Sequence, residues 1–271
     1  MRSGTLNSVG SSSIYSLPAS PVRSPVRGAA MTRAGNETWP DGSFVQQLPD
    51  ADRAALFDAG TPLRFEDDQI LVVQGDAGDY LYVLTSGLVK VIVGAVSGAQ
   101  TTLAIRSRGD LVGEFALLDD KPRMATARAG GPVTALKIGG AAFLAITSRS
   151  PAAQAAVTRY LLAKMRDATE RWSAERIWDA RERLAQVLYE LGRQHAQPDA
   201  DGMIRVPITQ SELGELAGVA VSTAERVLKD LRKQGVVSTR YREITIRDMA
   251  YLDSIRFSQE KARKPLTRGN L

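Results

Sequence analysis

Short apolar runs rich in β-branched and aromatic residues follow one another between Leu63 and Ile146. They are ILVV from Ile70, YLYVL from Tyr80, LVKVIV from Leu88, TTLAI from Thr101 and VTALKI from Val133. Glycine and aspartate separate the runs, in QGDAGD, SG, GAVSGAQ and RGD. Short strands at regular spacing with glycine-rich turns are typical of an antiparallel barrel or roll. We therefore expect an antiparallel β-roll over residues 41–149, with a turn at each separator.

A long helical pattern replaces the strands from Pro151 onward, at a position where proline fits the first turn of a helix. One stripe of this helix has the 4-3-4 spacing of a coiled-coil seam. The stripe consists of Leu161, Met165, Ala168 and Trp172. A second copy of the same helix is the simplest partner for it, so we expect a twofold homodimer through residues 150–179. The alternative is that the stripe packs on the roll of its own chain.

Residues 180–256 have the layout of a winged helix-turn-helix. They begin with the amphipathic stretch RLAQVLYELGRQHA and a short strand, IRVPI. A first helix opened by Thr209, a turn containing Gly218 and a cationic second helix then follow. Thr209 and Glu212 have the spacing of a capping box, in which hydroxyl and carboxylate each bind a free backbone amide. The sequence TRYREI closes the pattern with a basic turn suited to phosphate contacts.

Composition narrows the chemistry of this 271-residue chain. It has no cysteine and a single histidine, His195, which excludes disulfides, thiolate nucleophiles and an all-protein zinc site. No metal or covalent cofactor is therefore expected. No apolar run approaches the roughly 20 residues of a membrane-spanning helix, and the first residues lack the apolar region of a signal peptide. We expect a cytoplasmic protein with no membrane contact.

Charge is distributed unevenly along the chain. Residues 41–150 hold ten basic and 13 acidic side chains, whereas residues 151–271 hold 21 basic and 16 acidic ones. This contrast indicates that the C-terminal part meets an anionic polymer and the central part does not.

The two ends of the chain differ from the middle in composition. Residues 1–40 are rich in Ser, Gly, Pro and Arg and contain the duplication SPVRSPVR. Such a segment has too little apolar surface to offset its ordering entropy. We expect a disordered or loosely docked tail, with a basic arm that touches DNA as the alternative. A second tail, over residues 257–271, is basic.

Four stretches carry a resemblance to a known family. They are QGDAGDYLYVLTSGLVKV, GDLVGEFALLDDKPRMATARA, RERLAQVL and ITQSELGELAGVAVSTAERVLKDLRKQGVV with its wing. Through them, residues 45–255 resemble the cyclic AMP receptor protein family of bacterial transcription regulators. The resemblance implies an α+β fold, in which a β-roll (double-stranded β-helix) ligand domain is coupled by a dimerising helix to a winged helix-turn-helix. It also implies double-stranded DNA and RNA polymerase as partners.

The second helix of the motif departs from the pattern of that family. Ala220, Val221 and Ser222 stand where relatives commonly have a serine cap, an arginine and a glutamate. Arg226 occupies the position that usually reads a guanine, and it can bind O6 and N7 in a bidentate manner. Val221 offers only apolar contact, for example to a thymine methyl. Phosphate contacts are expected from Thr223, Lys229, Arg240 and Arg242.

Ser222 and Glu225 have two interpretations. Their spacing fits a second capping box, which would occupy both residues locally. Otherwise Glu225 can accept a hydrogen bond from a cytosine amino group. We favour the capping role.

The stretch GEFALLDDKPRMATARA holds the candidate ligand residues. A cyclic nucleotide needs a cation for its phosphate and an acceptor for its ribose hydroxyl, which Arg123 and Glu114 can supply. Gly113 lets the backbone approach closely, and the resemblance adds Phe115 to the site. The alternative is that Glu114 and Arg123 form an internal ion pair in an empty roll.

Two positions weaken the expected grip on cyclic AMP. The resemblance implies a serine or threonine beside the arginine, donating to the phosphate, but this chain has Met124. The family's pair of hydroxyl residues facing the adenine aligns with Ala168 and Thr169, so one hydroxyl remains. Losing one charge-assisted hydrogen bond costs about 1.5–3 kcal/mol, so we expect weak binding.

These observations predict a homodimeric, sequence-specific DNA-binding transcription regulator with a weak response to cyclic AMP. The same fold acting without a ligand is the alternative. An enzyme controlled by a cyclic nucleotide, or a ligand-binding adaptor, is a remote alternative. No nucleophile–histidine pair, metal cluster or phosphate-cradling loop is left in the sequence for catalysis, so no enzymatic activity is expected.

Overall fold

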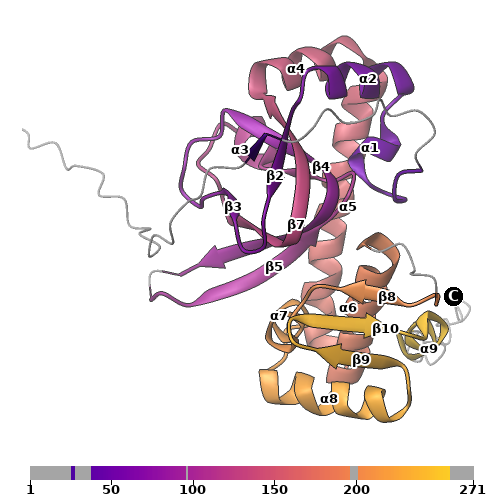
Figure 1. The fold of residues 1–271 in the computed structure, drawn as a ribbon. Coiled ribbons are helices and arrows are strands. Elements are labelled where there is room, and N and C mark those ends of the chain that lie inside the picture. The colour runs from indigo at the N-terminus through magenta and orange to yellow at the C-terminus, as the bar shows by residue number, and fades with distance from the viewer. Residues whose placement is uncertain (1–25, 28–37, 96, 196–200, 257–271) are drawn as a thin grey trace, which may run out of the picture.

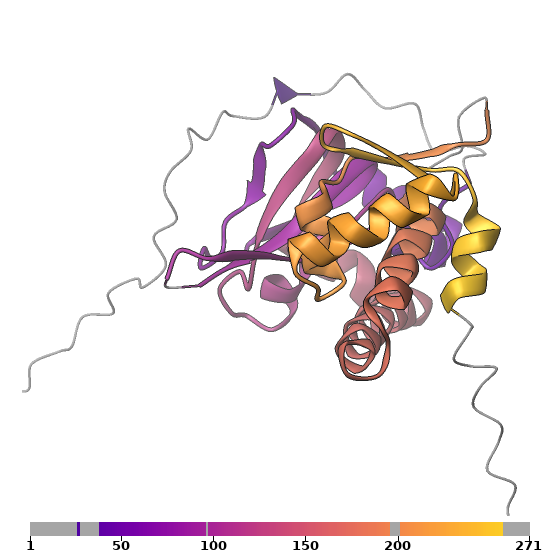
Figure 2. The same ribbon diagram turned by 90° about the horizontal axis from the view of Figure 1, so that it is seen from below.

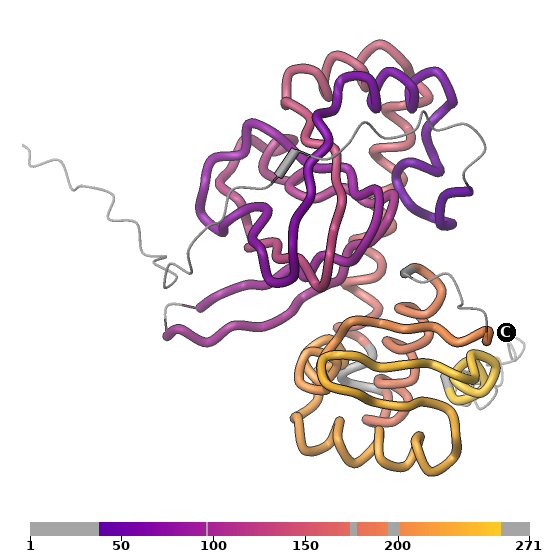
Figure 3. Tube along the Cα trace, in the orientation of Figure 1, coloured from indigo at the N-terminus to yellow at the C-terminus, as the bar shows by residue number. Residues whose placement is uncertain are grey.

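The computed structural model contains a β-rich domain and a smaller C-terminal domain along one long helix (Figure 1). It describes residues 26–27, 38–95, 97–195 and 201–256. Most of the predicted N-terminal tail and all of the predicted C-terminal tail lie outside the described residues. The Cα trace in Figure 3 shows helix α5, Pro151–Ile177, running from one domain to the other.

Seven strands form the sheet of the β-rich domain. They are β1 (Val26–Arg27), β2 (Thr61–Phe65), β3 (Ile70–Val72), β4 (Tyr80–Gly94), β5 (Gln100–Arg106), β6 (Leu111–Val112) and β7 (Thr126–Gly139). Their order is β1-β2-β7-β4-β5, with β3 paired to β7 and β6 paired to β4. All of these pairs are antiparallel, which confirms the predicted antiparallel roll.

Strand β4 joins two runs that the sequence pattern separates by a turn at Ser86 and Gly87. The chain passes through a bulge there instead, because the register with β7 shifts between Leu84 and Leu88. Gly87 has a left-handed φ of 80°, and a Cβ at this position would collide with the carbonyl of Pro132. The predicted turn is therefore wrong, and the glycine marks a bend in one continuous strand.

Alternation along β4 divides the roll into two cores. Tyr82 and Leu84 lie in the cluster inside the roll, together with residues of β2, β3 and β7. Leu81 and Val83 point to the opposite face and pack against helices. Tyr80, which packs against the inner cluster, also lies beside the guanidinium of the predicted ligand residue Arg123.

Three helices that the sequence pattern does not predict cover that opposite face together with α5. They are α1 (Phe44–Gln47), α2 (Asp50–Asp58) and α4 (Gly140–Arg149), and α2 and α4 form the upper end of the molecule in Figure 1. Helix α4 was missed because it follows β7 with no intervening turn, and Gly139 is both the end of the strand and the helix N-cap.

Helix α5 begins at Pro151, as predicted, but its exposed stripe differs from the predicted seam. Tyr160 is fully buried, and Leu161 beside it packs against the roll of its own chain. Leu162 is exposed, and so are Met165 and Trp172 of the same helix. Leu161 of the predicted seam is half-buried against the roll, and spacing alone does not show which of two adjacent leucines the roll covers.

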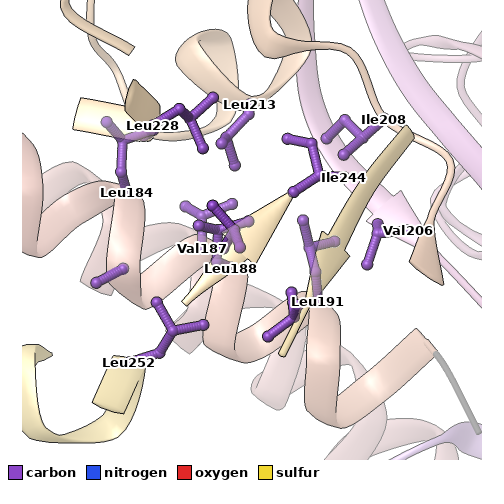
Figure 4. Close-up of a cluster of buried hydrophobic side chains, with 14 of the residues drawn as sticks. Leu184, Val187, Leu188, Leu191, Val206, Ile208, Leu213, Leu228, Ile244 and Leu252 are labelled. Atoms are coloured by element: carbon purple, nitrogen blue, oxygen red, sulfur yellow. The ribbon is translucent and has the colours of Figure 1, made fainter. Parts of the chain in front are cut away.

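The C-terminal domain is a winged helix-turn-helix, as predicted. Its elements are α6 (Ala180–His195), β8 (Ile204–Val206), α7 (Gln210–Leu216), α8 (Val221–Lys233), β9 (Val237–Arg240), β10 (Glu243–Ile246) and α9 (Met249–Arg256). Strands β8, β10 and β9 form a small antiparallel sheet in that order. Figure 4 shows the aliphatic core, in which Leu184 and Leu188 of α6 meet Leu213 of α7, Leu228 of α8 and Ile244 of β10.

Candidate DNA interface and ligand site

Helix α8 presents a polar, cationic face to solvent at the end of the molecule opposite α4 (Figure 1). Its inward residues are buried in the domain core; they are Ala224, Val227, Leu228 and Leu231. Glu225, Arg226 and Lys229 are exposed, and Val221 is 42% exposed. Thr223 is half-buried. The view from below in Figure 2 shows α8 lying across this end of the molecule.

The start of α8 differs from the favoured interpretation of the sequence. Its N-cap is Ala220, with extended backbone angles and no side-chain cap bond. Gly218, at a left-handed φ of 61°, ends α7, and the amide of Val219 donates to the carbonyl of Gly214 at 2.9 Å. The tight turn sets the helix start before Ser222, so the second capping box was wrong. Glu225 is therefore not occupied by a cap.

The first helix of the motif has the capping box that the sequence predicts. The amide of Glu212 donates to the Thr209 hydroxyl at 3.1 Å, and the amide of Thr209 donates to the Glu212 carboxylate at 2.8 Å. The box fixes the start of α7 beside the roll, and thereby the turn that aims α8.

The wing is a tight hairpin between β9 and β10, with Arg240 paired to Glu243. Arg240 is exposed, and Tyr241 at the tip is 92% exposed. Arg242 has a left-handed φ of 56°, and its guanidinium pairs with the carboxylate of Asp67 at 3.5 Å. Asp67 lies in the connection between β2 and β3 of the roll, so the structure places one predicted phosphate contact against the sensor domain.

Arg123 is held inside the roll by backbone groups. It is 3% exposed, and its guanidinium donates to the carbonyls of Gly113 at 2.5 Å and Tyr80 at 2.6 Å. Its Nε has no hydrogen-bond partner among the residues that the structure describes. Gly113 has a left-handed φ of 91°, and a Cβ there would overlap the guanidinium. Glycine is therefore needed at position 113 because any side chain there would occupy the space of the Arg123 guanidinium.

Glu114 lies at the start of helix α3, Glu114–Leu118, and is also 3% exposed. Burial raises the pKa of its carboxyl, an effect that the nearby positive charge of Arg106 opposes. The other charged groups acting on it are Asp110 and Lys164, on the side of α5. Among the described residues, the guanidinium of Arg123 bonds backbone carbonyls and not the Glu114 carboxylate, so the internal ion pair considered from the sequence does not form.

Aromatic and cationic neighbours of Arg123 were not found from the sequence. Tyr80 lies under the guanidinium, with 4.8 Å from Cζ to the ring centroid, and Lys137 Nζ lies 3.8 Å from the same centroid. The rings of Tyr80 and Tyr82 meet edge to face at 5.4 Å, and Tyr82 meets Phe65 at 5.5 Å. The period-2 spacing of Tyr80 and Tyr82 in the run YLYVL is the signal that places both rings on one face.

The remaining predicted ligand residues are Met124, Phe115 and Thr169. Met124 is 57% exposed, and Phe115 is also exposed. The hydroxyl of Thr169 donates to the carbonyl of Met165 within α5 at 2.9 Å. No hydrogen bond among the described residues joins Met124, Phe115 or Thr169 to Arg123.

Comparison with known proteins gives the architecture a family. A cyclic nucleotide-binding domain family matches residues 62–150, and a Crp-like helix-turn-helix domain family matches residues 182–255. A cyclic AMP receptor protein from Thermus thermophilus is 33% identical over 184 residues, which cover 68% of this chain and 82% of that protein. The chain belongs to the cyclic AMP receptor protein family.

Other known proteins are also similar to this chain in sequence or in fold. A CRP-like cAMP-activated global transcriptional regulator from Mycobacterium tuberculosis is 26% identical, over 72% of this chain and 88% of that protein. A solved CRP-family transcriptional regulator from Thermus thermophilus superposes with a TM-score of 0.59 at 26% identity, covering 72% of this chain and 96% of that one. FixK2 from Bradyrhizobium japonicum shares the fold, with a TM-score of 0.63 at 20% identity over 72% and 96% of the two chains.

Family membership settles the class of function. The protein is a DNA-binding transcription regulator with a cyclic nucleotide-binding domain, and its relatives are regulators rather than enzymes. Among the residues that the structure describes, no helix is long and apolar enough to cross a membrane. No cluster of potential metal ligands is found in the same residues.

Proposed function

We propose that the protein binds a roughly palindromic DNA site as a homodimer and responds weakly to cyclic AMP. The observation that carries the DNA part is that Arg226 and Lys229 of α8 and Arg240 of the wing are all exposed. A helix of this kind enters the major groove while the wing contacts phosphates. RNA polymerase is a further proposed partner, as expected for a regulator of this family.

Individual contacts follow from the exposed positions. Arg226 reads a guanine through its O6 and N7, and Val221 contacts a thymine methyl. Glu225 accepts from a cytosine amino group, because it is exposed and no cap occupies it. Thr223, Lys229, Arg240 and Arg242 contact phosphates.

The exposed side of α5 supports the homodimer. Leu162, Met165, Thr169 and Trp172 follow a 3-4-3 spacing and are all exposed. This is the heptad pattern of a two-stranded seam, and a second copy of α5 has the matching stripe. We assign the dimer interface to this stripe, within residues 150–179.

Arg123 supports an anionic ligand. Its charge is buried in the roll, and none of the carboxylates in the described part of the chain pairs with it. A buried cation without a counter-ion favours a bound anion such as a phosphodiester. Several relatives are named as cAMP-activated, which makes cyclic AMP the first ligand to test. Met124 at the serine or threonine position keeps the proposed affinity low.

One observation favours the alternative, a regulator that acts without a ligand. Two donors of the Arg123 guanidinium are already used by the carbonyls of Gly113 and Tyr80. A phosphate can reach only the remaining donors unless these bonds break. The same DNA-binding surface would then be active with the roll empty.

Replacing Arg226 by alanine tests the DNA assignment. We expect the variant to lose about 1–3 kcal/mol of binding to a duplex that the wild-type protein selects from a random pool, because a bidentate guanine contact is lost. Discrimination at one base pair of each half-site should relax. Affinity is measured by fluorescence anisotropy at fixed salt concentration.

Arg149→Ala is the matched control, since it removes the same charge from an exposed position on α4, at the other end of the molecule. Equal binding by wild type and Arg226→Ala would refute the guanine contact of Arg226, and failure of the wild-type protein to select any duplex would support a ligand-binding adaptor with no DNA role.

A further inference from the structure

The roll and the DNA-binding domain are docked together through the β4–β5 hairpin and helix α7. Leu88 of β4 and Ile105 of β5 belong to the same buried cluster as the core of the C-terminal domain. Just after β5, the Ser107 hydroxyl donates to the carbonyl of Gln194 in α6 at 3.1 Å. The two domains therefore share a continuous core rather than a flexible joint.

A buried ion pair fixes this contact. Lys90 of β4 is 3% exposed, and its ammonium donates to the carboxylate of Glu212 at 2.6 Å. Gly130 on the neighbouring strand makes room for the lysine, because a Cβ there would lie 2.9 Å from Lys90 Cε. One turn along α7, the carboxylate of Glu215 accepts the backbone amide of Thr102 at 2.8 Å.

At the edge of the docked surface, the roll also holds the wing. Asp67 accepts the amide of Gly131 through Oδ1 at 2.8 Å, which fixes its carboxylate, and its Oδ2 lies 3.5 Å from Arg242 Nη1. Arg242 is the wing residue that carries a left-handed φ, so its backbone is set by the hairpin. The sensor domain thus presents an immobilised carboxylate to a cation of the DNA-binding surface.

We propose that Asp67 is an intramolecular competitor of DNA for Arg242. The inference rests on the proposed DNA binding, and it adds a contact by which the roll lowers DNA affinity. A carboxylate and a DNA phosphate recognise a guanidinium in the same way, through charge-assisted hydrogen bonds. The Lys90–Glu212 pair keeps the two domains docked, so Asp67 competes at a high local concentration.

Asp67→Asn tests the competition. The amide keeps an Oδ1 acceptor for Gly131 but loses the charge that attracts Arg242. We expect the variant to bind DNA roughly two- to fivefold more tightly than wild type, the size of effect set by an exposed ion pair. The probe is a duplex of about 30 base pairs selected from a random pool by the wild-type protein, long enough for two half-sites.

Asp68→Asn is the matched control. Asp68 is adjacent and carries the same charge, but it pairs with Arg128 of the roll at 3.3 Å and not with the wing. Its removal measures the general effect of deleting one negative charge near DNA. The gain for Asp67→Asn must exceed the gain for this control.

A double-mutant cycle with Arg242→Gln identifies the partner. If Asp67 acts through Arg242, the Asp67→Asn substitution in the Arg242→Gln background raises DNA affinity no more than the Asp68→Asn control does. The inference is overturned if Asp67→Asn raises DNA affinity equally in the wild-type and Arg242→Gln backgrounds, or if it does not raise DNA affinity in the wild-type background. Either result leaves the proposed DNA binding intact. Failure of the wild-type protein to select any duplex overturns the proposed function itself, so the two failures are distinguishable.

Discussion

At the scale of single residues, Arg123 and Met124 are adjacent but differ in their surroundings. Arg123 is buried, and its Nε has no hydrogen-bond partner in the described part of the chain, whereas Met124 is mostly exposed beside it. A hydroxyl at position 124 would add a donor to the phosphate without displacing a core side chain. One of the two expected weaknesses of the proposed site therefore lies in a residue that can be replaced without disturbing the core.

We expect Met124→Ser to bind cyclic AMP more tightly than wild type by about 1.5–3 kcal/mol, or roughly tenfold to more than a hundredfold. Arg123→Ala should abolish the binding, because it removes the cation that attracts the phosphate. Isothermal titration calorimetry measures both. If Met124→Ser binds cyclic AMP no more tightly than wild type, Met124 is not the cause of weak binding. The Met124→Ser measurement is valid whether or not Arg123→Ala folds.

At the scale of elements, α5 has two apolar sides with different partners. Tyr160 and Leu161 anchor it to the roll of its own chain, and the hydroxyl of Tyr160 accepts the amide of Leu111 at 3.1 Å. Leu162 and Met165 face away from that contact and are exposed. The same helix can therefore hold its roll and offer a seam to a second copy.

Met165→Glu should dissociate the proposed dimer, because it places a charge in the centre of an apolar seam. Sedimentation velocity at micromolar concentration is expected to show a monomer, with the wild type dimeric. Gln154→Glu adds the same charge at an exposed position outside the stripe and should remain dimeric. Identical sedimentation of wild type and Met165→Glu would place the interface elsewhere.

At the scale of the whole molecule, we expect the docking of the two domains to depend on pH through Glu212, which pairs with Lys90 of the roll. Burial opposes its ionisation, but hydrogen bonds from Lys90 and Thr209 and the charge of Lys90 outweigh that effect, so the pKa lies below its ordinary value of 4.5. A carboxyl with a lowered pKa in the folded state stabilises the fold above its unfolded pKa. That contribution is lost as the pH falls through the lowered value.

Glu212→Gln should therefore unfold more easily than wild type at pH 7, by about 1–3 kcal/mol, because Lys90 loses its counter-ion. Glutamine can still complete the capping box with Thr209, so the start of α7 is retained. The difference should shrink as the pH falls below about 4.5, the ordinary glutamate value. Urea unfolding at a series of pH values measures it, and a difference independent of pH would exclude the ion pair as its cause.

The sequence by itself determined the elements whose signals are local. Thr209 and Glu212, three residues apart, formed the predicted capping box, and the alternating runs formed an antiparallel roll. Propensity, periodicity and capping act within a few residues, so they can be recognised without a fold. The residue types at Gly113 and Arg123 pointed to an anion site for the same reason.

The tertiary structure alone decided which of these residues meet. Lys90 and Glu212 are 122 residues apart, and no local pattern links them. Likewise, only packing shows that the roll covers Leu161 and leaves Leu162 exposed. Contacts between residues distant in sequence depend on how the two domains bury their shared surface. That arrangement minimises the free energy of the whole chain, and no single segment encodes it.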